Sequence, residues 1–273
     1  MQTITAADYV TVTSKDGTPL ALWKSGAGPA LLAVHGTCAD HTAWDSVVPL
    51  LADSFTVYAM DRRSRGASGD ASDYALEREF EDVAVAVDAP PGPVHLYGHS
   101  FGGFCAVEAA TRTRNLGRVV LYEGGPMPKP PGFRFTPDDF IAQLDQLIQA
   151  GQHEEAVTTF MLTAVGVVPA ELEVLRSHPA WPARVAAAHT IPRELRALNE
   201  YETDLARFGA IEAPVLLVVG ELTEARRREM FEGLARAVKH ARLAVLPGQR
   251  HAAHQTAPHL LAAALRDFLL ADT

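Results

Sequence analysis

The chain has 273 residues, of which 48% are hydrophobic, and it carries a formal net charge of −9 at pH 7. This length fits one large domain, or a core with an inserted subdomain, and the apolar content is sufficient for a sizeable core. The acidic balance argues against a nucleic-acid-binding surface and against binding to an anionic membrane. We therefore expect a small molecule as the partner, with the oligomeric state left open.

The sequence pattern predicts neither a signal peptide nor a membrane-spanning segment. The segment Met1–Thr5 lacks the basic start and the apolar stretch of a signal peptide. No run of residues is long and apolar enough to span a bilayer. The two cysteines, Cys38 and Cys105, are therefore predicted to be reduced thiols rather than a disulfide. A cytoplasmic location is the expectation from these features.

Predicted strands and helices alternate through the first 124 residues. Segments 9–13 and 20–24 are expected to form a hairpin, and the apolar run 30–34 is typical of a strand buried on both faces. The elements that follow are a helix over 41–52 capped by Asp40, a strand over 55–60, a helix over 76–87, a strand over 93–97, a helical pattern over 105–110 and a strand over 119–122. This alternation predicts a mostly parallel sheet with helices on both sides.

The pattern changes after Gly124, where prolines interrupt the chain and helices follow with no strand between them. These helices are expected from Thr136, as N-cap with Pro137 at N1, and over 154–165, 171–176, 182–188 and 193–207. Strands at 214–219 and 242–246 and helices at 224–238 and 257–270 then restore the alternation. The run Arg226–Arg228 in this part lies among glutamates and predicts a solvated helix face.

Together these elements predict an α/β fold with an eight-stranded, mostly parallel sheet and an inserted helical cap. The predicted core comprises residues 1–124 and 196–273, and the cap comprises 125–195. A cap over the carboxyl ends of the strands would cover an active site and shape access to it.

The segment Gly98–Gly103 reads Gly-x-Ser-x-Gly between a predicted strand and a predicted helix. This context is the one that a nucleophile elbow requires. Small residues are needed because strand and helix nearly collide there, which gives Gly98 and Gly102 a steric reason to be glycine. The turn exposes the Ser100 hydroxyl at a helix N-terminus, where backbone N–H groups can meet a developing negative charge.

Three further motifs follow other predicted strands in a fixed order: His35-Gly36, the segment 61–69 and the segment 248–251. In these motifs and the elbow the chain resembles the α/β-hydrolase superfamily, and within it small bacterial serine esterases and cofactor-free haloperoxidase-like members. The resemblance implies that Ser100 is the nucleophile and that His251 takes its proton, with His254 as the local alternative.

The third member of the expected triad departs from the commonest pattern of that superfamily. Thr223 stands about where an aspartate is customary, whereas Glu123 follows the strand predicted at 119–122. Some members of the superfamily carry their acid at that strand end, where it can orient the imidazole. We therefore favour Glu123, with Glu221 and Glu224 as alternatives.

The resemblance also implies an oxyanion hole made by the backbone N–H groups of Phe101 and Thr37. Cys38 lies beside Thr37 and is expected to line the substrate pocket or to fill space next to it. Phe160 and Met161 of the cap are expected to make that pocket largely apolar. The histidines lack zinc-ligand spacing, and the elbow explains the glycines better than a dinucleotide fingerprint, so no metal or cofactor is expected.

The function expected from these features is that of a serine hydrolase acting on an ester, a lactone or a thioester of a small apolar acid. Two alternatives use the same scaffold. One is non-hydrolytic chemistry such as carbon–carbon cleavage, lyase chemistry, acyl transfer or cyclisation. The other is a small-molecule receptor with vestigial turnover. The fold by itself does not separate the three.

Overall fold

A computed structural model describes residues 9–126, 128–129 and 132–271, and within these residues eight strands form one sheet. The strand order is β1-β2-β4-β3-β5-β6-β7-β8, antiparallel at β1, β2 and β4 and parallel from β4 to β8. The strands are β1 Tyr9–Thr13, β2 Pro19–Gly26, β3 Ala30–Val34, β4 Thr56–Met60, β5 Val94–His99, β6 Leu116–Tyr122, β7 Val215–Gly220 and β8 Ala241–Leu246. The predicted mostly parallel, eight-stranded sheet is confirmed.

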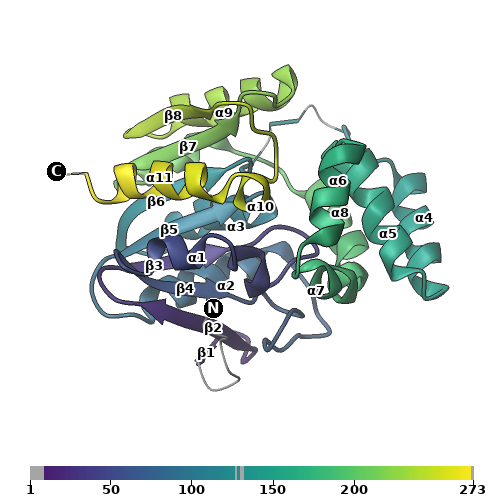
Figure 1. Ribbon diagram of the computed structural model, residues 1–273, viewed down its shortest axis with the longest axis horizontal. Helices are drawn as coiled ribbons and strands as arrows, with labels where there is room; N and C mark the ends of the chain where they lie inside the picture. The colour runs from purple at the N-terminus through teal and green to yellow at the C-terminus, as the bar shows by residue number, and fades with distance from the viewer. Residues whose placement is uncertain (1–8, 127, 130–131, 272–273) are drawn as a thin grey trace.

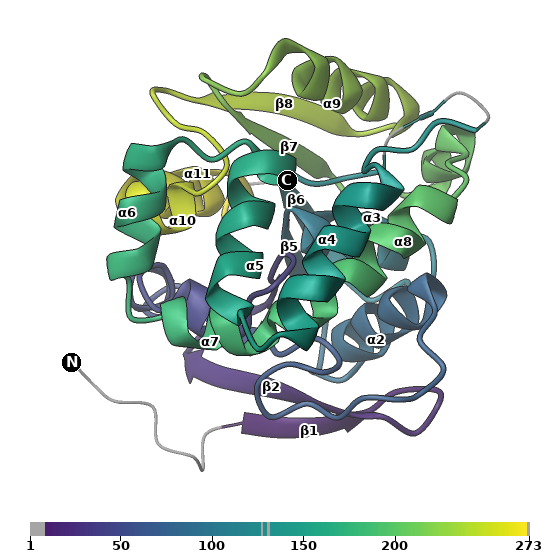
Figure 2. The ribbon, with the colours of Figure 1, turned by 90° about the vertical axis from the view of Figure 1, so that its right-hand side faces the viewer.

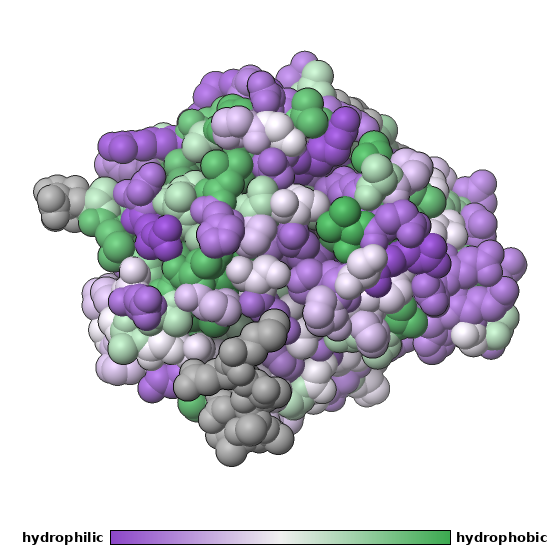
Figure 3. All heavy atoms as spheres, in the orientation of Figure 1, coloured by the Kyte–Doolittle hydropathy of each residue, from purple (hydrophilic) through white to green (hydrophobic). Residues whose placement is uncertain are grey.

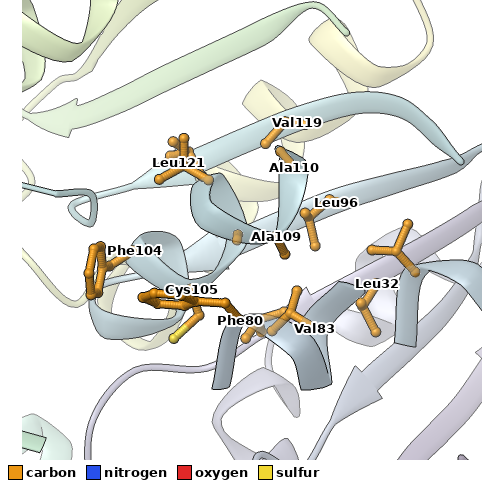
Figure 4. Close-up of a cluster of buried hydrophobic side chains, with 14 of the residues drawn as sticks. Leu32, Phe80, Val83, Leu96, Phe104, Cys105, Ala109, Ala110, Val119 and Leu121 are labelled. Carbon is orange, nitrogen blue, oxygen red and sulfur yellow. The ribbon is translucent and has the colours of Figure 1, made fainter. Parts of the chain in front are cut away.

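Helices cover both faces of this sheet (Figure 1). On one face, α2 (Leu76–Asp88), α3 (Phe101–Ala110) and α9 (Ala225–Ala237) bury Phe80, Phe104 and Leu234 against Leu96 and Leu121 of the strands. Figure 4 shows part of this cluster, in which side chains of α2 and α3 point toward the sheet. On the other face, α1 (Val48–Leu51) and α11 (Pro258–Leu269) pack on the alternate strand residues. The strands are therefore apolar on both faces, as parallel strands between helical layers must be.

A helical insertion separates β6 from β7, and we use this name for residues 138–200. It contains α4 Asp138–Gln149, α5 His153–Phe160, a π-helix Met161–Val165, α6 Pro169–Ser177, α7 Trp181–Ala186, a 3₁₀ turn Ala187–Thr190 and α8 Ile191–Glu200. Its helices form their own apolar cluster, into which Cys38 and Ala252 project from loops of the sheet domain. Figure 2 shows α4, α5 and α7 in front of the sheet, on the side where the parallel strands end. The insertion therefore lies where a ligand site is expected.

Several predicted element ends are wrong, and each has a local cause. The predicted helix 41–52 is a 3₁₀ turn, His41–Trp44, followed by α1, because Pro49 begins a new helical turn. Asp40 does cap the first of them, through its bond from the Thr42 N–H.

Thr136 is not the N-cap of α4. It is buried and exchanges backbone hydrogen bonds with the Asn199 side chain, while Pro137 stands at the cap position. The predicted helix 193–207 ends at Glu200 and is followed by a separate 3₁₀ turn, Leu205–Ala210. A cap boundary at residue 195 therefore falls inside α8, and the division into two domains stays a prediction.

The surface mixes polar and apolar side chains on the face shown in Figure 3. Both cysteines are buried and unpaired, as predicted. Within the described residues, the helices are too short or too polar to cross a bilayer.

Candidate active site

Ser100 lies in the tight turn between β5 and α3. Its backbone has φ 54° and ψ −125°, a conformation that non-glycine residues rarely adopt. A Cβ added at Gly98 would lie 2.6 Å from the carbonyl oxygen of Gly102, and one at Gly102 would lie 2.3 Å from that of Val34. Both positions thus have room only for glycine, and the strained serine is held at the N-terminus of α3.

Glu123 follows β6 directly and is almost fully buried, also with a positive φ of 51°. Its Oε1 accepts hydrogen bonds from the Gly220 N–H and from the Thr223 hydroxyl. Its Oε2 lies 3.6 Å from Nδ1 of His251, in the loop after β8. Three loops at the ends of β6, β7 and β8 therefore meet around one carboxylate.

Thr223, which occupies the position where an acid was expected, donates its hydroxyl hydrogen bond to the Glu123 carboxylate. Glu221 is exposed and accepts a hydrogen bond from the Gly248 N–H. Glu224 is also exposed, at the edge of a cavity described below. Of the three candidate acids, Glu123 is the one for which the structure shows an ion-pair contact with the His251 ring.

Burial and neighbouring charges set the protonation of the site. Burial lowers the pKa of His251, the Glu123 carboxylate raises it, Arg227 lowers it again, and the net pKa is below the ordinary value. Burial raises the pKa of Glu123, but His251, Thr223 and the Gly220 N–H together hold it below its ordinary value. At neutral pH the pair is therefore a carboxylate beside a neutral imidazole that can accept a proton.

Arg227 of α9 is part of this arrangement, and the sequence analysis did not predict it. Its Nη1 lies 3.1 Å from Nδ1 of His251 and 3.6 Å from Oε2 of Glu123, and its Nη2 donates to the Val165 carbonyl of the insertion. The expectation of a solvated helix face is wrong for this residue. Residue spacing within α9 does not reveal that His251 lies opposite the helix.

Two cavities adjoin Ser100, and Thr37, Phe160 and His251 line both of them. The larger has a volume of about 390 Å³. Its apolar walls include Phe104, Phe135, Phe140, Leu195, Leu198 and Phe231. The smaller has a volume of about 40 Å³ and is bordered also by Arg184, His99 and His254. Ser100 thus borders both a roomy cavity with aromatic walls and a small cavity whose mostly apolar wall also carries an arginine and histidines.

Residues 31–264 match the model of the alpha/beta hydrolase family. The chain belongs to this family. The crystal structure of an alpha/beta hydrolase from Sphaerobacter thermophilus DSM 20745 has a TM-score of 0.81 and 35% sequence identity to this protein, covering 95% of this chain and 99% of that one.

Two curated relatives are more distant or match a shorter part of this chain. The 2-(acetamidomethylene)succinate hydrolase of Mesorhizobium japonicum is 24% identical over 267 residues, which is 90% of either protein. The probable oxidoreductase EphD of Mycobacterium tuberculosis is 35% identical over 118 residues. That match covers 41% of this chain but only 20% of EphD.

The residues predicted for an oxyanion hole lie beside Ser100. Phe101 is the first residue of α3, so its N–H has no acceptor within the helix. Thr37 borders both cavities, and a Cβ added at its neighbour Gly36 would lie 2.9 Å from Cβ of Ser100. The loop after β3 therefore lies against Ser100.

Of the three residues predicted to line the substrate pocket, two line a cavity beside Ser100 and one does not. Phe160 lines both cavities and Met161 lines the smaller one. Cys38 lines neither: it is fully buried in the apolar cluster of the insertion, with Nη1 of Arg184 at 3.9 Å from its Sγ. The expectation that Cys38 lines the pocket is therefore wrong, and the reading of it as a buried filler fits. Its backbone φ is positive, at 45°.

His254, the alternative base, is buried beside the smaller cavity and packs against the rings of Trp44 and His99. Its Nδ1 is buried and has no hydrogen-bond partner. His99 contacts the His251 carbonyl at 2.8 Å through Nε2 and so fixes the loop that carries His251. Glu123 contacts the ring of His251, and the structure records no such carboxylate at His254.

One group of side chains in the described residues has the spacing of metal ligands: Asp40, His41 and Asp61. The carboxylate of Asp61 already accepts hydrogen bonds from His41, from Nε1 of Trp23 and from the Ala67 N–H. These contacts tie the loops after β3 and β4 to β2. They account for the group without an ion.

Proposed function

We propose that this protein is a serine hydrolase that cleaves an ester, a lactone or a thioester of a small, largely apolar substrate through an acyl-enzyme on Ser100. The observation that carries the proposal is the convergence of a strained, glycine-framed serine with a partly buried histidine and a buried carboxylate on one cavity wall. An unassisted serine hydroxyl is a poor nucleophile, and a neutral imidazole supplies the base that it needs.

In the proposed reaction the Ser100 oxygen attacks the carbonyl carbon while its proton passes to Nε2 of His251. The imidazolium is stabilised by Glu123, whose Oε2 faces Nδ1. The N–H groups of Phe101 and Thr37 receive the negative charge that develops on the carbonyl oxygen. His251 then protonates the leaving group, and water attacks the acyl-enzyme by the same route.

Arg227 must move for this cycle to run. Its guanidinium points at Nδ1 of His251, the atom that has to carry a proton toward Glu123. Hydrogen bonds of active sites without substrate are often displaced and tighten in the Michaelis complex. Arg227 bridges α9 and the Val165 carbonyl of the insertion, so a substrate that enters the larger cavity can shift it.

Hydrolysis is favoured over the other reactions of the scaffold by the relative that covers nine tenths of both chains and is named a hydrolase. The helical insertion would act as a cap over the site, and the aromatic walls of the larger cavity favour an apolar substituent. No cofactor enters the proposed mechanism, and the partner is a small molecule.

The test is intact-mass labelling with a small fluorophosphonate, followed by peptide mapping. We expect one adduct on Ser100 in the wild type and none in folded Ser100→Ala or His251→Ala. Ser100→Ala should also lose turnover of phenyl esters by about 10⁶-fold, as in other serine hydrolases. Labelling elsewhere, or ester turnover retained in Ser100→Ala, would remove Ser100 from the mechanism. Tight ligand binding without labelling or turnover would favour the receptor.

A further inference from the structure

Arg184 differs from every other buried arginine of the described residues. Arg62, Arg63 and Arg65 each lie within 4.0 Å of at least one carboxylate oxygen. Arg184 of α7 is 8% exposed, and no carboxylate of the described chain lies within that distance. Its recorded polar contact is with Sγ of Cys38, a weak acceptor, at 3.9 Å. This guanidinium is therefore buried without a counter-ion.

A buried charge without a partner is unfavourable, and arginine does not escape by losing its proton. Lysine or histidine could become neutral in such a place, whereas a guanidinium stays charged. The cation of Arg184 borders the same small cavity as Ser100 and His251. An anion that enters this cavity would supply the missing partner.

A second, independent group in the cavity also lacks a partner. His254 is 2% exposed, lines the cavity and has no hydrogen-bond partner at Nδ1. Burial, followed by the charge of Arg184, lowers the pKa of His254 well below its usual range, so its ring is neutral at pH 7. A neutral ring with its proton on Nδ1 donates one hydrogen bond. Arg184 comes from the insertion and His254 from the short helix α10 (Ala253–Thr256), and both line the same cavity.

The size of the cavity limits what the anion can be. One water-sized group needs roughly 10–15 Å³ of such space, so about 40 Å³ holds about three. A carboxylate has three heavy atoms. The remaining walls include Ala39, Ala43 and Val167, which leave no room for a phosphate ester or an aromatic acid.

From these observations we infer that the small cavity is a carboxylate subsite, in which Arg184 and His254 bind a free carboxylate of the substrate. The inference rests on the proposed function, because Ser100 marks the carbonyl that reacts. Since the cavity adjoins Ser100, only a short chain separates the two groups. The apolar part occupies the larger cavity. The substrate class is a half-ester of a short dicarboxylic acid with an apolar alcohol or thiol.

The kinetic arm compares phenyl hydrogen succinate with phenyl 4-methylpentanoate, whose acyl group has a similar shape and no charge. We expect wild-type kcat/KM to favour the anionic ester, and Arg184→Gln to lower the ratio of the two values by about 10- to 100-fold. Arg184→Lys should restore part of the ratio, because it keeps a charge but not the bidentate geometry. Arg176→Gln is the matched control, since it removes a positive charge from an exposed site of the same insertion.

The binding arm needs no turnover. In Ser100→Ala protein, sodium succinate should raise the melting temperature more than neutral succinamide does, and Arg184→Gln or His254→Phe in the same background should abolish the difference. Succinate binding without any ester turnover would reject the proposed function and keep the subsite. Turnover of the neutral ester with no succinate binding and no change of ratio in Arg184→Gln would reject the subsite and keep the function. Should Arg184→Gln fail to fold, Arg184→Lys and the Ser100→Ala titration decide.

Discussion

Two clusters of charge in this protein are built on different principles. In the first cluster, Arg62 and Arg65 of the loop after β4 share the carboxylates of Glu79 and Glu194. All four side chains have zero exposure. Around Ser100, by contrast, Glu123 stands 3.6 Å from a neutral histidine, and Arg184 has no carboxylate partner in the described chain. Both clusters join the helical insertion to the sheet domain.

The difference separates a structural use of charge from a chemical one. In the first cluster each cation is neutralised in place, so removal of one member leaves an uncompensated buried charge and costs stability. In the second, Arg184 lacks a carboxylate, and Glu123 lies beside a neutral histidine and the partly exposed Arg227. These charges are therefore available to a reacting or entering group. Substitutions in the first cluster should therefore change stability, and substitutions in the second should change catalysis.

The largest effect on catalysis after loss of the nucleophile is expected for Glu123→Gln. The amide keeps an acceptor for the Gly220 N–H and the Thr223 hydroxyl, so the loop should stay in place. It cannot stabilise the imidazolium or hold the correct tautomer, and kcat should fall by about 10⁴-fold. Steady-state kinetics with a phenyl ester measures this, with circular dichroism to check the fold.

Glu221→Gln is the matched control, because Glu221 is exposed and contacts the Gly248 N–H rather than the His251 ring. It should keep kcat within a few-fold of the wild type. The reverse order of the two losses would place the acid in the loop after β7 and would break the division between the clusters.

The free energy of unfolding should respond to substitutions in the first cluster rather than the second. Glu194→Gln removes one carboxylate from between Arg62 and Arg65, and a broken buried pair costs about 3–5 kcal/mol of the free energy of unfolding. Arg184→Met removes a cation that has no such partner and should leave that free energy unchanged or higher. Urea unfolding at pH 7.5, with m-values compared, measures both variants.

Equal destabilisation by Glu194→Gln and Arg184→Met would mean that Arg184 makes an interaction that stabilises the fold. The comparison of the two clusters would then fail, and with it the reason to assign an anion to the small cavity.

Local motifs made much of the site predictable. Ser100, Glu123 and His251 each follow a strand, and parallel strands end at the same edge of a sheet, so the order of motifs along the chain indicated which side chains meet. The glycines of the elbow were predictable for the same reason, because steric contact between β5 and α3 acts over a few residues.

The residues that sequence reasoning missed depend on contacts across the fold. Arg184 and Arg227 both lie on predicted helices, and their spacing indicates only the faces of those helices. What lies opposite is set by how α7 and α9 pack on loops far away in sequence. The expected place of Cys38 was wrong for a related reason: its side chain packs among helices of the insertion that are distant in the sequence.

The smallest effect is expected at Arg227, whose guanidinium contacts both His251 and Glu123. The positive charge of Arg227 lowers the pKa of His251, and activity requires the neutral ring. Activity therefore falls as pH drops through that pKa, and Arg227→Met, which raises it, should move the acid limb of kcat/KM to higher pH. Glu123, Arg184, His99 and His254 also face this ring and are unchanged in the variant.

A pH series at low salt measures the acid limb of kcat/KM for the wild type and for Arg227→Met. The difference should shrink at 1 M salt, because Arg227 is partly exposed and its charge is screened. An unchanged limb at low salt would show that Arg227 has already left His251 in solution.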